Sequence, residues 1–159
     1  MQLQWYDRAV SVPQPESAEG RPSRQEEFNK SLVQRAFEEV FASDAFDEAA
    51  IARNFSPKYV QKTDGRTLDF TGFVAHVREL KRTLKNVKIT FERVVAEGAN
   101  VVSVHRAEAE KGQGGRIAIR VFALFVIDEG KIVLCDELTR LEQGAAEDRD
   151  LASLQPNQR

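Results

Sequence analysis

Four side chains have types suited to acid–base chemistry. His105 and Glu137 can each act as a general base, and Arg120 can stabilise a negatively charged oxygen. Tyr59, far upstream, can donate a proton or orient an oxygen atom of a substrate. Because these residues are distant in sequence, a site made of them depends on how the strands pair.

The last two predicted strands give a register for Arg120 and Glu137. Residues 116–127 and 132–141 are β-prone, and the Glu-Gly pair between them is typical of a two-residue hairpin loop. Counting back from that loop places Phe122 opposite Glu137, and opposed residues point to the same side of a sheet. We therefore expect Arg120, Phe122 and Glu137 on one face. Arg120 and Glu137 should pair there, because a buried unpaired carboxylate is costly.

The position of His105 depends on the length of a glycine-rich loop. A four-residue loop, 112–115, places His105 opposite Phe122 and adds it to the face of Arg120 and Glu137. A five-residue loop instead places Arg106 opposite Arg120, and directly opposed like charges are unfavourable. The sequence therefore favours the first register, although a slip of one residue removes His105 from the group.

Each of these residues also has a structural interpretation. Arg120 and Glu137 can be an ion pair within a sheet, and His105 can be a half-buried ring with its hydrogen bonds satisfied. Tyr59 can be an aromatic plug with its hydroxyl at the rim of the core. Cys135 lies on an apolar strand, where a packed thiol is expected rather than a nucleophile.

The elements that must position these residues can be read from periodicity and capping signals. Residues 23–42 begin with a capping box and carry an apolar stripe of helical spacing. Asp44 and Asp69 can cap a second and a third helix, with a short extended segment around Tyr59 between them. Four long strands follow after Asn86. The order predicts an α+β fold in which a cone-shaped, curved antiparallel sheet wraps around three N-terminal helices.

Both faces of the last hairpin are largely apolar, so both need to be covered. The helices can cover one face. A second copy of the chain can cover the other, so we expect a homodimer that forms through the sheet.

The composition excludes several classes of protein. The chain has 159 residues with 42% hydrophobic and 30% charged residues, which is typical of one globular domain. Its net charge of −2 argues against a dedicated nucleic-acid binder. The single cysteine rules out an intrachain disulfide and a zinc site built from cysteines. No apolar run approaches the roughly 20 residues of a membrane span, and no secretory signal is evident, so we expect a cytoplasmic protein without a membrane partner.

The two ends of the chain differ from the middle. Residues 1–22 contain three of the five prolines and are expected to form a flexible arm, which carries Trp5 and Tyr6. The predicted domain spans residues 23–145, and residues 146–159 are expected to form a C-terminal tail.

Three local strings and the order of elements resemble a known superfamily. The strings are Phe55-Ser56-Pro57-Lys58-Tyr59-Val60-Gln61, Val95-Ala96-Glu97-Gly98-Ala99-Asn100-Val101 and Ile127-Asp128-Glu129-Gly130-Lys131-Ile132-Val133. Together they resemble the nuclear transport factor 2-like (NTF2-like) superfamily, in its SnoaL-like branch. A further string, Cys135-Asp136-Glu137-Leu138-Thr139, resembles a subgroup of uncharacterised bacterial members. The resemblance implies a cone-shaped barrel with a pocket between sheet and helices. Members include isomerases, cyclases, dehydratases and epoxide hydrolases as well as non-catalytic binding domains, so the fold alone assigns no reaction.

The resemblance implies which residues line the pocket, but this sequence departs from the motifs of the members with known activities. The positions carried over are Tyr59, Gln61, His105, Arg120 and Glu137. Lysine follows Gln61 where the cyclase branch often has histidine, and the residues flanking Arg120 do not complete the acidic trio of the epoxide hydrolases.

Two hypotheses follow. The first is a small-molecule pocket that performs acid–base chemistry such as isomerisation, dehydration or cyclisation. Glu137, His105 and Tyr59 would be its catalytic residues, and Arg120, Gln61 and Phe122 would contact the ligand. No cofactor is expected, because the sequence lacks a dinucleotide fingerprint and a phosphate loop, and no metal is expected. The second is a non-enzymatic dimerising or partner-binding module whose pocket is filled by its own side chains.

Overall fold

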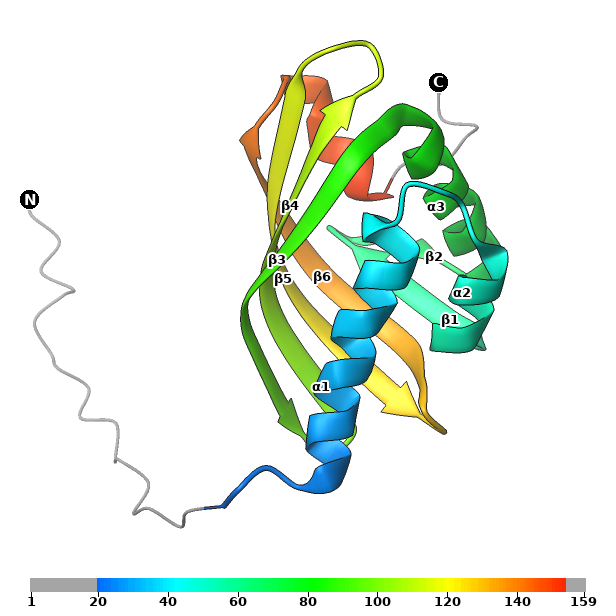
Figure 1. The fold of residues 1–159 in the computed structure, drawn as a ribbon, viewed down its shortest axis with the longest axis vertical. Coiled ribbons are helices and arrows are strands. Elements are labelled where there is room, and N and C mark those ends of the chain that lie inside the picture. The colour runs from blue at the N-terminus through cyan, green and yellow to red at the C-terminus, as the bar shows by residue number, and fades with distance from the viewer. Residues whose placement is uncertain (1–19, 154–159) are drawn as a thin grey trace, which may run out of the picture.

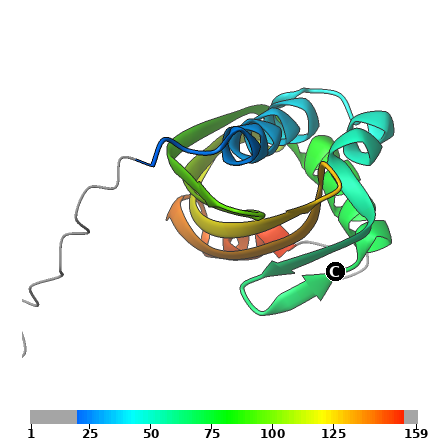
Figure 2. The ribbon, with the colours of Figure 1, turned by 90° about the horizontal axis from the view of Figure 1, so that it is seen from below.

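One curved six-stranded sheet wraps around helices in the computed structural model, which describes residues 20–153 (Figures 1 and 2). This confirms the predicted α+β class. The arm with Trp5 and Tyr6 lies outside the described residues. The helical elements are α1 (Arg24–Phe37), the π-helical turn η1 (Glu38–Ala42), α2 (Glu48–Asn54), α3 (Phe70–Thr83) and the 3-10 helix η2 (Ala146–Ser153). The strands are β1 (Phe55–Thr63), β2 (Arg66–Leu68), β3 (Leu84–Glu97), β4 (Asn100–Lys111), β5 (Arg116–Asp128) and β6 (Lys131–Gln143).

The helices begin where side chains satisfy their first amide groups. Ser23 and Glu26 form the predicted capping box, with Glu26 accepting from the Ser23 amide at 2.7 Å. Asp69 caps α3 as predicted. The second helix is capped by Asp47 rather than by Asp44, because the Asp47 carboxylate accepts from the Ala50 amide.

The strand order in the sheet is β2-β1-β6-β5-β4-β3. Strand β1 pairs parallel with β6, and every other pairing is antiparallel. The sheet curves around α1, with α2 beside it (Figure 2). The short C-terminal helix η2 lies near α3, at the end of the molecule where the loop between β4 and β5 projects (Figure 1). The predicted tail therefore begins with a helix, which packs onto the domain through a 3.0 Å salt bridge between Lys111 and Asp148.

The register that we favoured for β4 is wrong by one residue. Arg106 lies opposite Arg120, and His105 lies opposite Val121, so the loop between β4 and β5 has five residues. Carboxylates relieve the repulsion between the two arginines. Arg106 pairs with Glu142 at 2.8 Å, and Arg120 pairs with Glu92 at 2.6 Å.

The predicted register of β6 is also wrong by one residue beyond the hairpin. A bulge lies between the pairs Val126–Leu134 and Ile127–Ile132, so Val133 is an extra residue on β6. Glu137 is therefore opposite Ala123 instead of Phe122. The bulge moves Glu137 to the face of the sheet that the helices cover.

The two shifts together decide which residues share a face. Val121 and Ala123 are buried on the concave face, so His105 and Glu137 both point toward the helices. Arg120 is on the convex face, as is Phe122, which is 53% exposed. The expected ion pair between Arg120 and Glu137 is therefore wrong.

Candidate functional site

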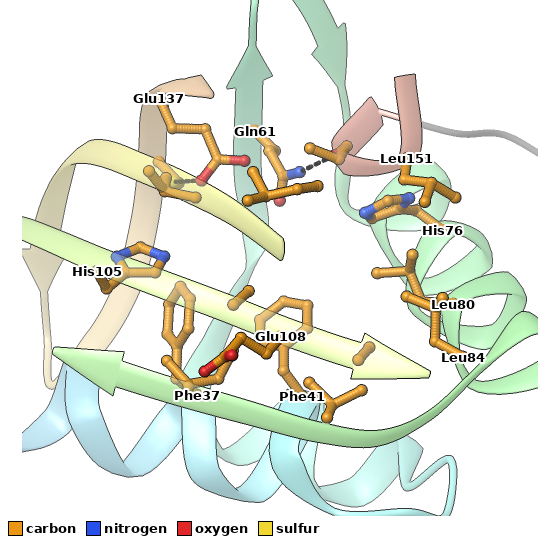
Figure 3. A pocket seen from close by; sticks show the side chains of 18 of the residues that line it. Phe37, Phe41, Gln61, His76, Leu80, Leu84, His105, Glu108, Glu137 and Leu151 are labelled. Carbon is orange, nitrogen blue, oxygen red and sulfur yellow. Dashed lines mark hydrogen bonds between the residues drawn. The ribbon is translucent and has the colours of Figure 1, made fainter. Parts of the chain in front are cut away.

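A cavity of about 130 Å³ lies between the concave face of the sheet and the helices (Figure 3). Its apolar walls come from the helical side and from β5, and they include Phe37, Phe41, Leu80, Ile119 and Phe125. Leu151 of η2 also lines it. The described side chains leave this space between the sheet and the helices unfilled.

The polar wall of the cavity is built by two neighbouring strands. Tyr59, Gln61 and Thr63 alternate along β1, so all three point to the same face. The parallel register places Gln61 beside Cys135 and Thr63 beside Glu137 on β6. Thr63 does not itself line the cavity but lies beside Glu137, and it was not predicted, although its spacing of two residues from Gln61 is a signal for a shared face.

Glu137 is the acidic group of this wall. Its Oε1 accepts a hydrogen bond of 2.9 Å from the Thr63 hydroxyl, and its Oε2 lies 3.5 Å from the donating Cys135 thiol. Removal of water raises the pKa of Glu137 to about 7, and the nearby carboxylates Asp64 and Asp136 act in the same direction. The two hydrogen bonds lower the pKa but do not offset the loss of water. Glu137 can therefore both take up and release a proton near neutral pH.

Tyr59 and Cys135 stay protonated beside this carboxyl group. Burial raises the pKa of Tyr59 well above its ordinary value, and Cys135 and Glu137 add to the effect. Burial likewise raises the pKa of the Cys135 thiol. The thiol is therefore not activated as a nucleophile, in agreement with the interpretation of Cys135 as a packed thiol.

His105 faces the same cavity from β4 (Figure 3). It is 2% exposed, its Nδ1 lies 2.9 Å from the Ser103 hydroxyl, and its ring centroid lies 5.0 Å from that of Phe37 in an edge-on arrangement. Burial lowers the pKa of His105 to about 4. The ring is therefore neutral at physiological pH and can exchange hydrogen bonds with a ligand without carrying charge.

Two further titratable residues line the cavity from α3. Lys81 donates a hydrogen bond of 2.5 Å to the carbonyl of Phe41 and another to the carbonyl of Ser43, and so caps the end of η1. Burial lowers the pKa of Lys81. His76 is buried and also contributes to the wall. Neither residue was placed in the site by sequence analysis.

The structure thus brings together part of the predicted site. Tyr59, Gln61, His105 and Glu137 line the cavity, whereas Arg120 and Phe122 do not. Within residues 20–153, no group of three histidine, cysteine or acidic side chains is arranged to hold a metal ion. In the same part of the chain, no helix is long and apolar enough to cross a membrane. The arrangement suits proton transfer by Glu137 next to a neutral imidazole in largely apolar surroundings.

The fold and the cavity define an α+β protein in which helices lie against the concave face of a curved sheet. Residues 33–135 match the SnoaL-like domain, and the chain belongs to this family. The resemblance found in the sequence strings is thereby confirmed at the level of the family. The matched region ends two residues before Glu137.

Relatives with similar sequence or fold occur in different organisms. An uncharacterised protein of Schizosaccharomyces pombe is 31% identical over 127 residues, which are 80% of this chain and 97% of that protein. Because that relative is from fission yeast, membership of a bacterial subgroup stays a prediction. A candidate SnoaL-like polyketide cyclase from Jannaschia sp. CCS1 has a TM-score of 0.64 at 19% identity, over 75% of this chain and 90% of that one. An LEH-like epoxide hydrolase of M. tuberculosis has a TM-score of 0.62 at 17% identity, over 72% and 84% of the two chains. At these identities the two structures establish the fold alone.

Proposed function

We propose that this protein binds a small, compact organic molecule in the cavity and catalyses proton transfer on it, as an isomerase, dehydratase or cyclase does. The observation that carries the proposal is the placement of Glu137, a carboxyl group with a pKa of about 7 in the wall of an otherwise largely apolar cavity. A group with its pKa near the working pH is an efficient general acid and base. The names of the structural neighbours from Jannaschia and M. tuberculosis agree with a small-molecule enzyme.

The size of the cavity limits the ligand. An apolar protein cavity of roughly 150 Å³ holds benzene, so about 130 Å³ suits a molecule of one ring. The ligand should carry a carbonyl or hydroxyl group, which protonated Glu137 or neutral His105 can bind. It should be uncharged, because burial shifts the pKa of Glu137, His105 and Lys81 toward their neutral forms.

In the proposed mechanism, ionised Glu137 removes a proton from a carbon next to the ligand carbonyl and returns it elsewhere. His105 would donate a hydrogen bond to the carbonyl oxygen as that oxygen gains negative charge. Tyr59 would stay protonated and so add no negative charge beside Glu137. This replaces the sequence-based role of Arg120 as the group that stabilises the oxyanion, since Arg120 is on the other face of the sheet.

The setting in which the protein works is also a proposal. We expect it to act as a homodimer through the convex face of the sheet, where Phe122 and Leu138 are exposed. We expect it in the cytoplasm, where its single thiol, Cys135, would stay reduced.

Exchange of hydrogen for deuterium tests the proposed chemistry without knowledge of the natural substrate. Single-ring ketones are incubated with the protein in D₂O, and loss of the α-proton signals is followed by NMR. We expect faster exchange with the unmodified protein and the background rate with Glu137→Gln. Arg120→Gln is the matched control and should exchange as fast as the unmodified protein. Binding of the ketones without any exchange would indicate a binding module instead of an enzyme.

A further inference from the structure

Gln61 connects Glu137 to the C-terminal helix through a chain of hydrogen bonds. The Tyr59 hydroxyl donates to Gln61 Oε1 at 3.1 Å, and Gln61 Nε2 donates to Thr63 Oγ1 at 3.2 Å. The Thr63 hydroxyl then donates to Glu137 Oε1 at 2.9 Å. Gln61 Nε2 also lies 3.5 Å from the backbone carbonyl of Ala152 in η2, a contact drawn in Figure 3.

The partners of Gln61 determine which way its amide points. The carbonyl of Ala152 can only accept, so the nitrogen of the amide must lie on that side and on the side of Thr63. The oxygen then faces Tyr59, whose hydroxyl must donate. Both amide hydrogens are used within the protein, which leaves Gln61 no hydrogen for a ligand.

The direction of the chain determines what Thr63 can do. The Thr63 hydroxyl oxygen accepts a hydrogen bond from Gln61, so the hydroxyl hydrogen is free to be donated to Glu137. All donors of the chain therefore point toward the carboxylate, and such chains polarise each bond further. Glu137 Oε1 is held as an acceptor.

We propose that Gln61 is a positioning residue, whose amide directs the Thr63 hydroxyl onto Glu137 Oε1 and leaves Oε2 as the oxygen that gains and loses the proton. The inference rests on the proposed role of Glu137 in proton transfer. Gln61 thus acts on the reacting carboxyl group through Thr63, rather than by contact with the ligand. Its orientation depends on Ala152, which lies outside the matched SnoaL-like region.

Several other groups act on Glu137 and must be kept unchanged in a test. Asp64 from the turn between β1 and β2 and Asp136 from β6 raise its pKa, whereas the thiol of Cys135 lowers it by donating to Oε2. Tyr59 of β1 and His105 of β4 line the same cavity. The variants that test the proposal therefore alter only Gln61 and Thr63, and Cys135 is changed only in a separate control.

A titration of Glu137 by carbon-13 NMR of its carboxyl group tests the proposal. The signal is assigned by its absence in Glu137→Gln, and no ligand is required. Gln61→Met keeps the length of the side chain and removes both amide hydrogens. We expect Gln61→Met to raise the pKa of Glu137 above about 7, by roughly half a unit, because the Thr63 bond to the ionised form weakens.

A double-mutant cycle shows whether the effect passes through Thr63. Thr63→Val should raise the pKa of Glu137 and abolish any further effect of Gln61→Met, whereas Thr63→Ser should preserve both the original value and the effect. Cys135→Ala is the matched control, because it removes the donor to Oε2 and should add independently to Gln61→Met. If Thr63→Val does not fold, Thr63→Ala provides the same comparison. An equal shift by Gln61→Met with and without the Thr63 hydroxyl would refute the positioning role, as would no shift or a fall.

The same titration separates this inference from the proposed function. If Glu137 of the unmodified protein titrates near its ordinary value of 4.5, the proposed function loses its acid–base group and the inference falls with it. If Glu137 titrates near 7 but does not respond to Gln61→Met, only the role of Gln61 is refuted.

Discussion

His105 and Glu137 face one cavity from strands β4 and β6, on either side of β5, and burial moves their pKa values in opposite directions. The pKa of Glu137 rises to about 7, and that of His105 falls to about 4. Between these values the carboxyl group carries a proton and the imidazole does not. Both side chains are therefore uncharged in this range, and above about pH 7 Glu137 becomes the ionised base of the proposed mechanism while His105 stays a neutral hydrogen-bond donor.

Glu137 should make the free energy of unfolding depend on pH. The folded protein keeps the proton up to about pH 7, whereas the unfolded chain loses it above about pH 4.5. The contribution of Glu137 to the free energy of unfolding therefore falls as the pH rises through this range, by up to roughly 3 kcal/mol. Glu137→Gln should remove this fall and make the protein more stable than the unmodified chain at pH 8. Urea unfolding at pH values from 4 to 8 measures the difference.

Asp136→Asn is the control for that experiment. Asp136 neighbours Glu137 in sequence but is exposed, so its replacement should leave most of the fall in place. Parallel pH curves for the unmodified protein and Glu137→Gln would show that folding does not raise the pKa of Glu137.

His105 should have the opposite effect on the acidic side. Its pKa is about 4 in the folded protein and near 6.5 in the unfolded chain, so the contribution of His105 to the free energy of unfolding falls by roughly 3 kcal/mol as the pH falls from 6.5 to 4, which opposes the contribution of Glu137 over most of this range. His105→Gln should remove this contribution, so that the protein gains stability relative to the unmodified chain as the pH falls from 6.5 to 4.5. Ser103→Ala keeps the imidazole and should retain the loss. Thermal unfolding at pH 4.5, 5.5 and 6.5 gives the comparison, and an unchanged slope in His105→Gln would contradict the assigned burial.

Filling the cavity should abolish ligand binding while the acid–base group remains. Ala107 lines the cavity from β4, and Ala107→Phe adds a ring to a space of about 130 Å³. Deuterium exchange into single-ring ketones should fall at least tenfold. The carboxyl group of Glu137 should still titrate well above 4.5, because the added ring excludes water further. Exchange at the original rate would place the reacting ligand elsewhere on the protein.

The convex face of the sheet should hold two copies of the chain together. Phe122 and Leu138 lie directly opposite each other on β5 and β6 and are 53% and 67% exposed. Light scattering should give twice the mass of 17.9 kDa for the unmodified protein. Phe122→Asp combined with Leu138→Asp should give the single mass, because burying two carboxylates opposes association. Phe28→Asp, on α1, is the control and should stay dimeric; a monomeric unmodified protein would rule out the interface.

Much of the architecture can be predicted from local signals in the sequence. The capping box at Ser23, the cap at Asp69 and the change from helical to alternating periodicity, which we expected after Asn86 and which the structure places at Leu84, each depend on residues close in the chain. Such signals define where elements begin and which residues share a face of one element. They also identified His105 and Glu137 as members of a common group.

The predicted registers of β4 and β6 were each wrong by one residue, and the two errors cancelled for His105 and Glu137. The loop between β4 and β5 is one residue longer than expected, and the extra residue Val133 on β6 shifts Glu137 by one place. Each shift turns a strand over relative to β5. His105 and Glu137 therefore remained together, while Arg120 and Phe122 passed to the opposite face.

The sequence by itself determined the order of the main elements, the starts of α1 and α3 and the alternation along the long strands, because these depend on contacts within a few residues. The tertiary structure alone decided the registers and the parallel pairing of β1 with β6, which brings Thr63 beside Glu137. Both faces of β5 are largely apolar, so burial of apolar area does not distinguish one register from the next. The bulge in β6 and the five-residue loop between β4 and β5 fix the registers, through backbone hydrogen bonds between strands that no local pattern encodes.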